Sequence, residues 1–227
     1  MQPAIGFLKL DTRFPRGPGD AGCAATWRFP ALYYTVRRAS PSRVIPQRAD
    51  DLLPAFIAGG KKLAARGAAG ISATCGFLVR HQNALAAALP VPVMASALLY
   101  GPRLQQSLPA GKSLGILTVS PKDLSAADLR AAGLDISKTI IGGLPPSSAT
   151  ADSLLNNRRT LDAARAKEDM RLAAEELRRS GGGKIGAVLL ECANMPAFSG
   201  AVAAAAGAPV FSILDAVNDF YGSLAGA

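Results

Sequence analysis

The chain has 227 residues, 49% of them hydrophobic, and a net charge of +9 at pH 7. This length and composition allow a large buried core. No apolar run reaches the roughly 18 to 20 residues of a membrane-spanning helix, and the N-terminal MQPAIGFLKLD lacks the basic start of a signal peptide. We therefore expect a globular, cytoplasmic protein with no membrane partner.

The positive charge is spread along the chain in separate pairs. No aromatic residues are interleaved with these pairs, as they are in many segments that bind nucleic acid. We therefore expect no nucleic-acid partner, and a surface that attracts small carboxylates. The sequence leaves open whether the protein forms a homodimer. The pairs are Arg37-Arg38, Lys61-Lys62, Arg158-Arg159 and Arg178-Arg179.

Strand and helix patterns alternate along the whole chain, which predicts an α/β protein with parallel sheets covered on both faces. Ser125 is expected to cap a helix that ends at Gly133, and Gly101-Pro102 to break another. Strands are predicted at 5–10, 70–75, 91–96, 113–120, 137–144, 185–192 and 209–214. Helices are predicted at 49–66, 78–88, 97–108, 125–133, 160–180, 197–206 and in the C-terminal tail, with a loop or short helix at 145–157.

The order of elements occurs twice. The first series of helices and strands begins with the strand at 5–10 and ends with a strand that leads to Cys75. The second series begins with the strand at 113–120 and ends with a strand that leads to Cys192. We therefore expect two pseudo-symmetric lobes, each a mainly parallel sheet flanked by helices, with the active site in the cleft between them. The first lobe is residues 1–105, completed by 206–227, and the second is residues 106–205.

The two cysteines are the strongest candidates for chemistry. GISATCGF and GAVLLECANMP both place a thiol at the end of an apolar strand, next to small or hydrogen-bonding residues. In open α/β sheets, ligands bind at the carboxyl ends of strands. Amides at a helix start would favour a thiolate and a bound carboxylate. These stretches predict that Cys75 and Cys192 form a two-base proton-transfer site.

Polar and small residues near the predicted strand ends are candidates for binding the substrate. Arg16 could hold a carboxylate through two hydrogen bonds, and Thr118 could donate one from the end of its strand. We assign no catalytic role to Cys23, which lies in a glycine-rich loop. The predicted binding residues are Asp11, Arg16, Ser72, Thr74, Gly76, Thr118, Ser120 and Asn194.

Three other kinds of site are not expected. Gly17 to Gly22 fits G-x-G-x-x-G but does not directly follow a strand, so we expect a mobile or substrate-covering loop there instead of a dinucleotide site. The three cysteines and His81 lack the closely paired spacing of structural zinc ligands. A redox disulfide between Cys75 and Cys192 would need their Cα atoms within about 7 Å. We therefore expect no metal and no cofactor.

Across essentially its whole length, the chain resembles the aspartate/glutamate/hydantoin racemase superfamily, through SATCGF, LLECANMP and the duplicated layout. In that superfamily two cysteines from two similar lobes face each other across the substrate, without metal or pyridoxal cofactor. The resemblance implies that Cys75 and Cys192 are the opposed acid/base groups of an amino-acid racemase or epimerase. One sulfur would be a thiolate and the other a thiol, exchanging roles with the handedness of the substrate.

The resemblance leaves the substrate open. Glutamate racemases carry a histidine two residues after the second cysteine, where this chain has Asn194, and an acidic-serine-glycine motif where it has LDTRFPR. Aspartate, other acidic amino acids, hydantoins and related carboxylates remain candidates. The alternatives are a maleate-isomerase-like or arylmalonate-decarboxylase-like enzyme of the same fold, and a non-catalytic carboxylate-binding protein.

Overall fold

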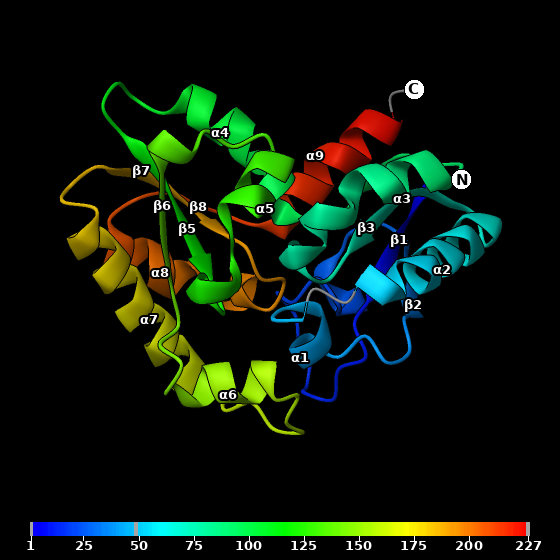
Figure 1. Ribbon diagram of the computed structural model, residues 1–227, viewed down its shortest axis with the longest axis horizontal. Helices are drawn as coiled ribbons and strands as arrows, with labels where there is room; N and C mark the ends of the chain where they lie inside the picture. The colour runs from blue at the N-terminus through cyan, green and yellow to red at the C-terminus, as the bar shows by residue number, and fades with distance from the viewer. Residues whose placement is uncertain (1, 48–49, 226–227) are drawn as a thin grey trace.

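The computed structural model describes residues 2–47 and 50–225, which form two four-stranded parallel sheets (Figure 1). This confirms the predicted α/β fold with two pseudo-symmetric lobes. The first sheet has the order β2-β1-β3-β4, and the second has the order β6-β5-β7-β8. The strands are β1 (Ala4–Lys9), β2 (Ala31–Thr35), β3 (Ala68–Ala73), β4 (Val93–Met94), β5 (Ser113–Thr118), β6 (Thr139–Gly143), β7 (Ile185–Leu190) and β8 (Val210–Phe211).

The two sheets are alike in detail as well as in strand order. Each has one register irregularity between its first two paired positions, at Ala4/Ile5 in one sheet and Ser113/Leu114 in the other. The residue before each cysteine also makes the same backbone bond, from Thr74 N to Leu8 O at 3.0 Å and from Glu191 N to Leu117 O at 2.9 Å. Thr74 and Glu191, and hence Cys75 and Cys192, occupy equivalent positions.

The long helices α2 and α7 cover the sheets with their buried apolar residues. α2 packs on β1, β2 and β3, and α7 packs on β5 and β6. Close packing requires glycine at two equivalent positions, since a side chain on Gly6 would meet Leu63 and Ile71, and one on Gly115 would meet Leu177. The helices are α1 (Pro41–Val44), α2 (Leu53–Ala65), α3 (Gln82–Ala88), α4 (Gly101–Ser107), α5 (Ala126–Ala131), α6 (Ala149–Leu155), α7 (Ala163–Ser180), α8 (Ser199–Ala206) and α9 (Ile213–Ala225).

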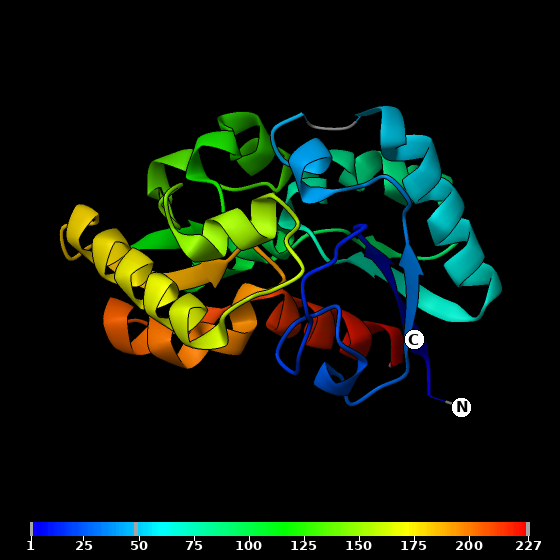
Figure 2. The ribbon, with the colours of Figure 1, turned by 90° about the horizontal axis from the view of Figure 1, so that it is seen from below.

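Two helices cross from one lobe to the other. α4 follows β4 of the first sheet but packs on β5 of the second, and α9 follows β8 of the second sheet but packs on β3 of the first. α9 therefore runs between the lobes, as the red helix in Figures 1 and 2. Within residues 206–227, which were predicted to complete the first lobe, β8 pairs with β7 in the second sheet and α9 packs on β3 of the first.

Most predicted elements are present, with shorter strands at the sheet edges. Ser125 caps α5 in a capping box with Asp128, and Gly101 and Pro102 begin α4 where the break was expected. β2 and α1 were not predicted, because the half-exposed edge strand ALYYT has no clear apolar alternation. Residue 49 of the predicted helix 49–66 lies outside the described residues. Among the helices described, none combines the length and the apolar character needed to cross a membrane.

Candidate active site

Both cysteines lie two residues beyond the carboxyl end of a central strand, as predicted. Cys75 follows β3 and Cys192 follows β7. In each sheet this strand pairs with the first strand of its lobe. The second strand of the lobe lies on one side of this pair, and the fourth strand lies on the other side. Such a switch in strand order opens a crevice at the carboxyl ends of the strands, where open α/β proteins bind their ligands.

Cys75 lies at the start of a short 3-10 helix, η3 (Gly76–His81), with an extended backbone at φ −152° and ψ 119°. Burial, followed by the charge of Glu191, raises the pKa of the Cys75 thiol from 9.0 to about 12. The backbone N–H of Phe77 and the guanidinium of Arg80 act in the opposite direction and lower this pKa. The groups at the start of η3 therefore favour the thiolate, whereas burial and Glu191 oppose it.

Cys192 has a different hydrogen-bond environment. Its Sγ lies 3.2 Å from Oδ1 of Asn194, an amide oxygen that can only accept, so the thiol donates the bond. Burial and then the charge of Glu191 raise the pKa of Cys192 well above 9.0, and the charge of Cys75 raises it further. The backbone N–H of Asn194 acts in the opposite direction and lowers this pKa, as the Phe77 N–H does for Cys75. Burial and the nearby charge of Glu191 therefore favour the neutral thiol of Cys192 over the thiolate.

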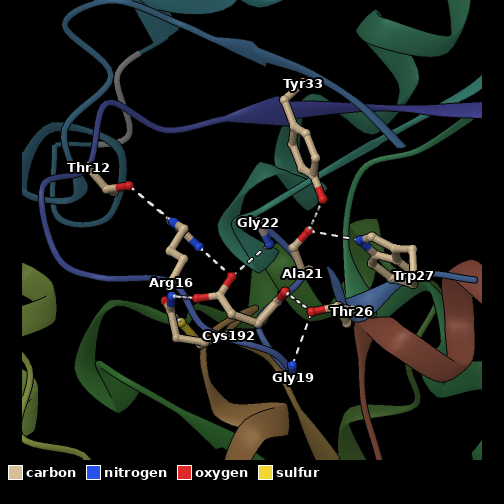
Figure 3. A network of polar contacts seen from close by, with 11 residues as sticks. Thr12, Arg16, Gly19, Ala21, Gly22, Thr26, Trp27, Tyr33 and Cys192 are labelled. Carbon is tan, nitrogen blue, oxygen red and sulfur yellow. Dashed lines mark hydrogen bonds and ion pairs between the residues drawn. The ribbon is translucent and has the colours of Figure 1, made fainter. Parts of the chain in front are cut away.

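A loop of the first lobe fixes the orientation of Asn194. Its Nδ2 donates to Oδ2 of Asp20 at 2.5 Å, which leaves Oδ1 to face Cys192. Asp20 is itself held by a 2.7 Å ion pair with Arg16 and by the backbone N–H of Gly22, also at 2.7 Å. Figure 3 shows this network with Cys192 beside it.

The same loop is anchored to the two lobes by its backbone. Ala21 N donates to Ala193 O at 3.1 Å, next to Cys192. Ala21 O accepts from Trp27 Nε1 at 3.1 Å and from the Tyr33 hydroxyl at 3.2 Å, as Figure 3 shows. A side chain on Gly19 would collide with the backbone of Ala197, so the loop lies directly on the second lobe. The G-x-G-x-x-G segment therefore forms a loop over the Cys192 end of the site.

Glu191 is a buried carboxyl group whose charge raises the pKa of both cysteines. It is 1% exposed, and its Oε2 accepts a 2.7 Å hydrogen bond from Thr118. Its Oε1 has no hydrogen-bond partner among the described residues. Burial raises the pKa of Glu191 from 4.5 to about 7, against the lowering effect of the Thr118 hydrogen bond.

The predicted binding residues divide into two groups. Thr118, Gly76 and Asn194 lie around Glu191 and the cysteines. Thr74 is also buried, and its hydroxyl has no hydrogen-bond partner within the described part of the chain, so it is free to meet a ligand. The assignment of these four residues to substrate binding stays a prediction.

The side chains of the other four predicted binding residues also make hydrogen bonds within the protein, and their assignment likewise stays a prediction. Arg16 contacts Asp20 and Thr12, and exposed Asp11 accepts from the backbone N–H of Arg38. Ser72 donates to Met94 O at 2.9 Å, and Ser120 donates to Asp123 at 2.5 Å. These contacts place their side chains in the framework around the site.

Asp20 and Glu191 are two buried acidic residues near the cysteines that were not among the predicted site residues. A signal was present for Glu191, because a carboxylate at the end of the apolar run GAVLLEC is seldom buried without a specific partner. No local pattern marked Asp20, whose role depends on Asn194, 174 residues away. Among the described residues, no three His, Cys, Asp or Glu side chains are placed to hold a metal ion.

Comparison with known proteins gives sequence relatives of one kind. No protein-family model matches the chain. It is 28% identical to dimethylsulfoniopropionate lyase 7 of Emiliania huxleyi over 98% of this chain and 67% of that protein. It is 27% identical to lyase 3 of the same organism, over 98% of this chain and 60% of that protein. The chain thus spans about two thirds or less of the length of these relatives.

Structural comparison identifies the fold. Unliganded arylmalonate decarboxylase aligns with a TM-score of 0.65 and 18% identity, covering 99% of this chain and 93% of that one. A glutamate racemase from Bacillus anthracis aligns with a TM-score of 0.62 and 18% identity, covering 98% and 84%. The chain therefore has the α/β fold of the aspartate/glutamate racemase superfamily, which arylmalonate decarboxylase shares.

Proposed function

We propose that this protein is a cofactor-independent enzyme that removes the hydrogen on the carbon beside the carboxylate of a small substrate, and that it acts as an amino-acid racemase or epimerase. The observation that carries the proposal is the placement of Cys75 and Cys192 after equivalent strands of two similar lobes. Such a pair offers one acid/base group to each face of a substrate carbon. Racemisation requires both.

The site contains the groups that this reaction needs. One sulfur, as thiolate, takes the α-hydrogen as a proton, and the other, as thiol, delivers a proton to the opposite face. The carbanion places negative charge on the substrate carboxylate, where hydrogen-bond donors would stabilise it. The buried Thr74 hydroxyl, which has no hydrogen-bond partner among the described residues, and the amides at the start of η3 are suitable donors.

A lyase reaction is a second candidate, favoured by the whole-chain sequence relatives named dimethylsulfoniopropionate lyases. Its first step is the same removal of a hydrogen beside a carboxylate. The C–H electron pair then forms a C=C bond while the C–S bond breaks, and dimethyl sulfide leaves with the C–S electron pair. This elimination needs one base only, which agrees with Cys192 being held as a thiol by Asn194.

Proton NMR in D₂O tests both candidates with the purified protein. The substrates are both enantiomers of aspartate and glutamate, hydantoins, malonates, maleate and dimethylsulfoniopropionate. A racemase exchanges the α-hydrogen of both enantiomers of one substrate and interconverts them. A lyase releases dimethyl sulfide and acrylate from the sulfonium substrate. Binding of a carboxylate without exchange or product would contradict both reactions and favour a binding protein.

Cys75→Ala and Cys192→Ala are the decisive variants. For the racemase, either change should abolish interconversion, because one face of the carbon then has no acid/base group. Cys23→Ala is the matched control, since Cys23 lies in the loop and is partly buried. Full activity in either of the first two variants would overturn the proposal.

A further inference from the structure

Glu191 is the ionisable group in this site that the proposed reaction does not yet use. It precedes Cys192 in the chain, and its Oε1 and backbone oxygen lie against Gly76, the residue after Cys75 in the other lobe. A side chain on Gly76 would lie 2.5 Å from the backbone oxygen of Glu191 and still closer to Oε1. The carboxyl group is thus built into the contact between the two cysteine loops.

The hydrogen bonding of Glu191 leaves one oxygen available for a proton. Thr118 donates to Oε2, whereas Oε1 is buried and has no hydrogen-bond partner among the described residues. A buried oxygen that makes no hydrogen bond favours the protonated carboxyl group, because a neutral group is cheaper to bury than an ion, and the nearby Phe77 amide acts against this.

Each group that surrounds Glu191 contributes to this balance. Arg80 of η3 lowers the pKa of Glu191, and Asp128 at the start of α5 raises it. Arg80 is paired with Asp128 through hydrogen bonds of 3.1 and 3.2 Å from Nε and Nη2, whereas its buried Nη1 has no hydrogen-bond partner among the described residues. The Phe77 amide lowers the pKa of both Glu191 and Cys75, which places the carboxyl and the thiol near the same donor.

Glu191 also acts on both sulfurs. Its negative charge raises the pKa of Cys75 and of Cys192, and in each case it is the strongest influence after burial. A thiolate and an ionised Glu191 therefore oppose each other in the same buried space. A site with this arrangement favours a single negative charge.

We propose that Glu191 is a positioning residue that limits the cysteine pair to one negative charge, by holding a proton whenever Cys75 is a thiolate. In the transfer, the S–H bond of Cys75 breaks, its electron pair stays on sulfur, and an O–H bond forms at Oε1 of Glu191. Charge and protons balance within the site. Before the substrate reacts, Cys192 is the thiol that donates to Asn194, so the pair starts with the one thiolate and one thiol that acid/base chemistry on two faces needs, and each turnover exchanges these two states.

The proposal makes a prediction that requires no substrate. Alkylation by iodoacetamide, followed by mass spectrometry of the Cys75 peptide, measures the thiolate across a pH series. In the wild-type protein the rate should rise about tenfold per pH unit up to about pH 7 and then become flat. Above that pH, Glu191 is ionised. A Cys75 thiolate then forms either beside the negative charge of Glu191 or by transfer of the Cys75 proton to Glu191, and this transfer does not depend on pH.

Glu191→Gln removes the ionisable group and keeps the shape. The Cys75 rate should then continue to rise above pH 7, exceeding the wild-type rate by about tenfold for each further pH unit. Cys23 in the same digest controls for the reagent, and Glu176→Gln, at an exposed glutamate of α7, controls for the substitution. We call the pH at which the alkylation rate stops rising the break. Limited access of the reagent to Cys75 lowers the rate by the same factor at every pH and leaves the position of the break unchanged.

Thr118→Val is the second variant. It removes the hydrogen bond that lowers the pKa of Glu191, so the break should move to higher pH. A Glu191→Gln protein that keeps the wild-type break, a wild-type profile without a break, or a break unmoved by Thr118→Val would each overturn the inference.

This inference rests on the proposed roles of the two cysteines, but the two can fail separately. A break that depends on Glu191, in a protein that exchanges no α-hydrogen, would support the inference and reject the proposed enzyme. Exchange without such a break would do the reverse.

Discussion

The ends of β3 and β7 are equivalent in backbone and different in chemistry. Thr74 and Glu191 make the same backbone hydrogen bond to the neighbouring strand, and a cysteine follows each. A backbone amide two residues on lowers the thiol pKa at both ends, that of Phe77 for Cys75 and that of Asn194 for Cys192, but Cys192 also donates to a side-chain oxygen, Oδ1 of Asn194. A duplicated fold therefore places two sulfurs symmetrically, and the residues beside them give the sulfurs unequal roles.

The largest expected effect is on activity, and it tests whether both cysteines are needed for the reaction. Cys75→Ala and Cys192→Ala should each reduce α-hydrogen exchange with interconversion by about 10³-fold or more, because general acid/base catalysis contributes about 10²- to 10⁴-fold. For a lyase, Cys75→Ala alone should have this effect. Proton NMR in D₂O of the two variants separates these results, and nearly full activity in Cys75→Ala would contradict both.

The next effect is on the free energy of unfolding and concerns Glu191. This residue occupies the position in the second lobe that is equivalent to Thr74 in the first. Its folded-state pKa of about 7 exceeds its ordinary 4.5, so the folded protein binds more protons between these values. Glu191 therefore favours folding at low pH, and this contribution is lost as pH rises from 4.5 to 7. The loss has an upper value of roughly 3 kcal/mol.

Urea unfolding of the wild type and of Glu191→Gln, measured at several pH values, checks this prediction. The free energy of unfolding of the wild type should fall relative to the variant between pH 4.5 and 7 and stay level above. A constant difference across this range would show that Glu191 has an ordinary pKa.

The residues that follow the two cysteines, Gly76 and Ala193, differ in how closely they are packed. Gly76→Ala would push a methyl group into the carboxyl and backbone oxygen of Glu191, and should lower the free energy of unfolding by about 1–3 kcal/mol. Ala193→Gly, at the equivalent position, removes a buried methyl group and should cost about 1 kcal/mol, the approximate value of one buried CH₂. Thermal or urea unfolding measures both, and an equal cost would contradict the asymmetry in packing.

The smallest expected effect sharpens the difference between the sulfurs. Asn194→Leu keeps the size of the side chain but removes the oxygen that accepts from Cys192. Loss of a hydrogen bond of about 1 kcal/mol should raise the ratio of Cys192 to Cys75 alkylation roughly fivefold. Ser72→Ala, which removes a hydroxyl bonded to Met94 O in the first lobe, is the control and should leave the ratio unchanged.

The sequence by itself determined the fold class, the duplicated order and the position of both thiols. Short apolar runs, glycine stops and a capping serine are local signals, so β3, β7 and α5 could be predicted from neighbouring residues alone. The edge strand β2 and the position of β8 could not, because strand pairing depends on residues far away in the chain.

Only the tertiary structure decided the environment of each thiol. Asp20 reaches Asn194 across 174 residues, and Glu191 reaches Gly76 in the loop of the other cysteine. The pKa of a buried group depends on which charges and donors surround it in space. The sequence therefore placed two cysteines at strand ends, and the packing of the lobes oriented Asn194 through Asp20 and brought the charge of Glu191 close to both thiols.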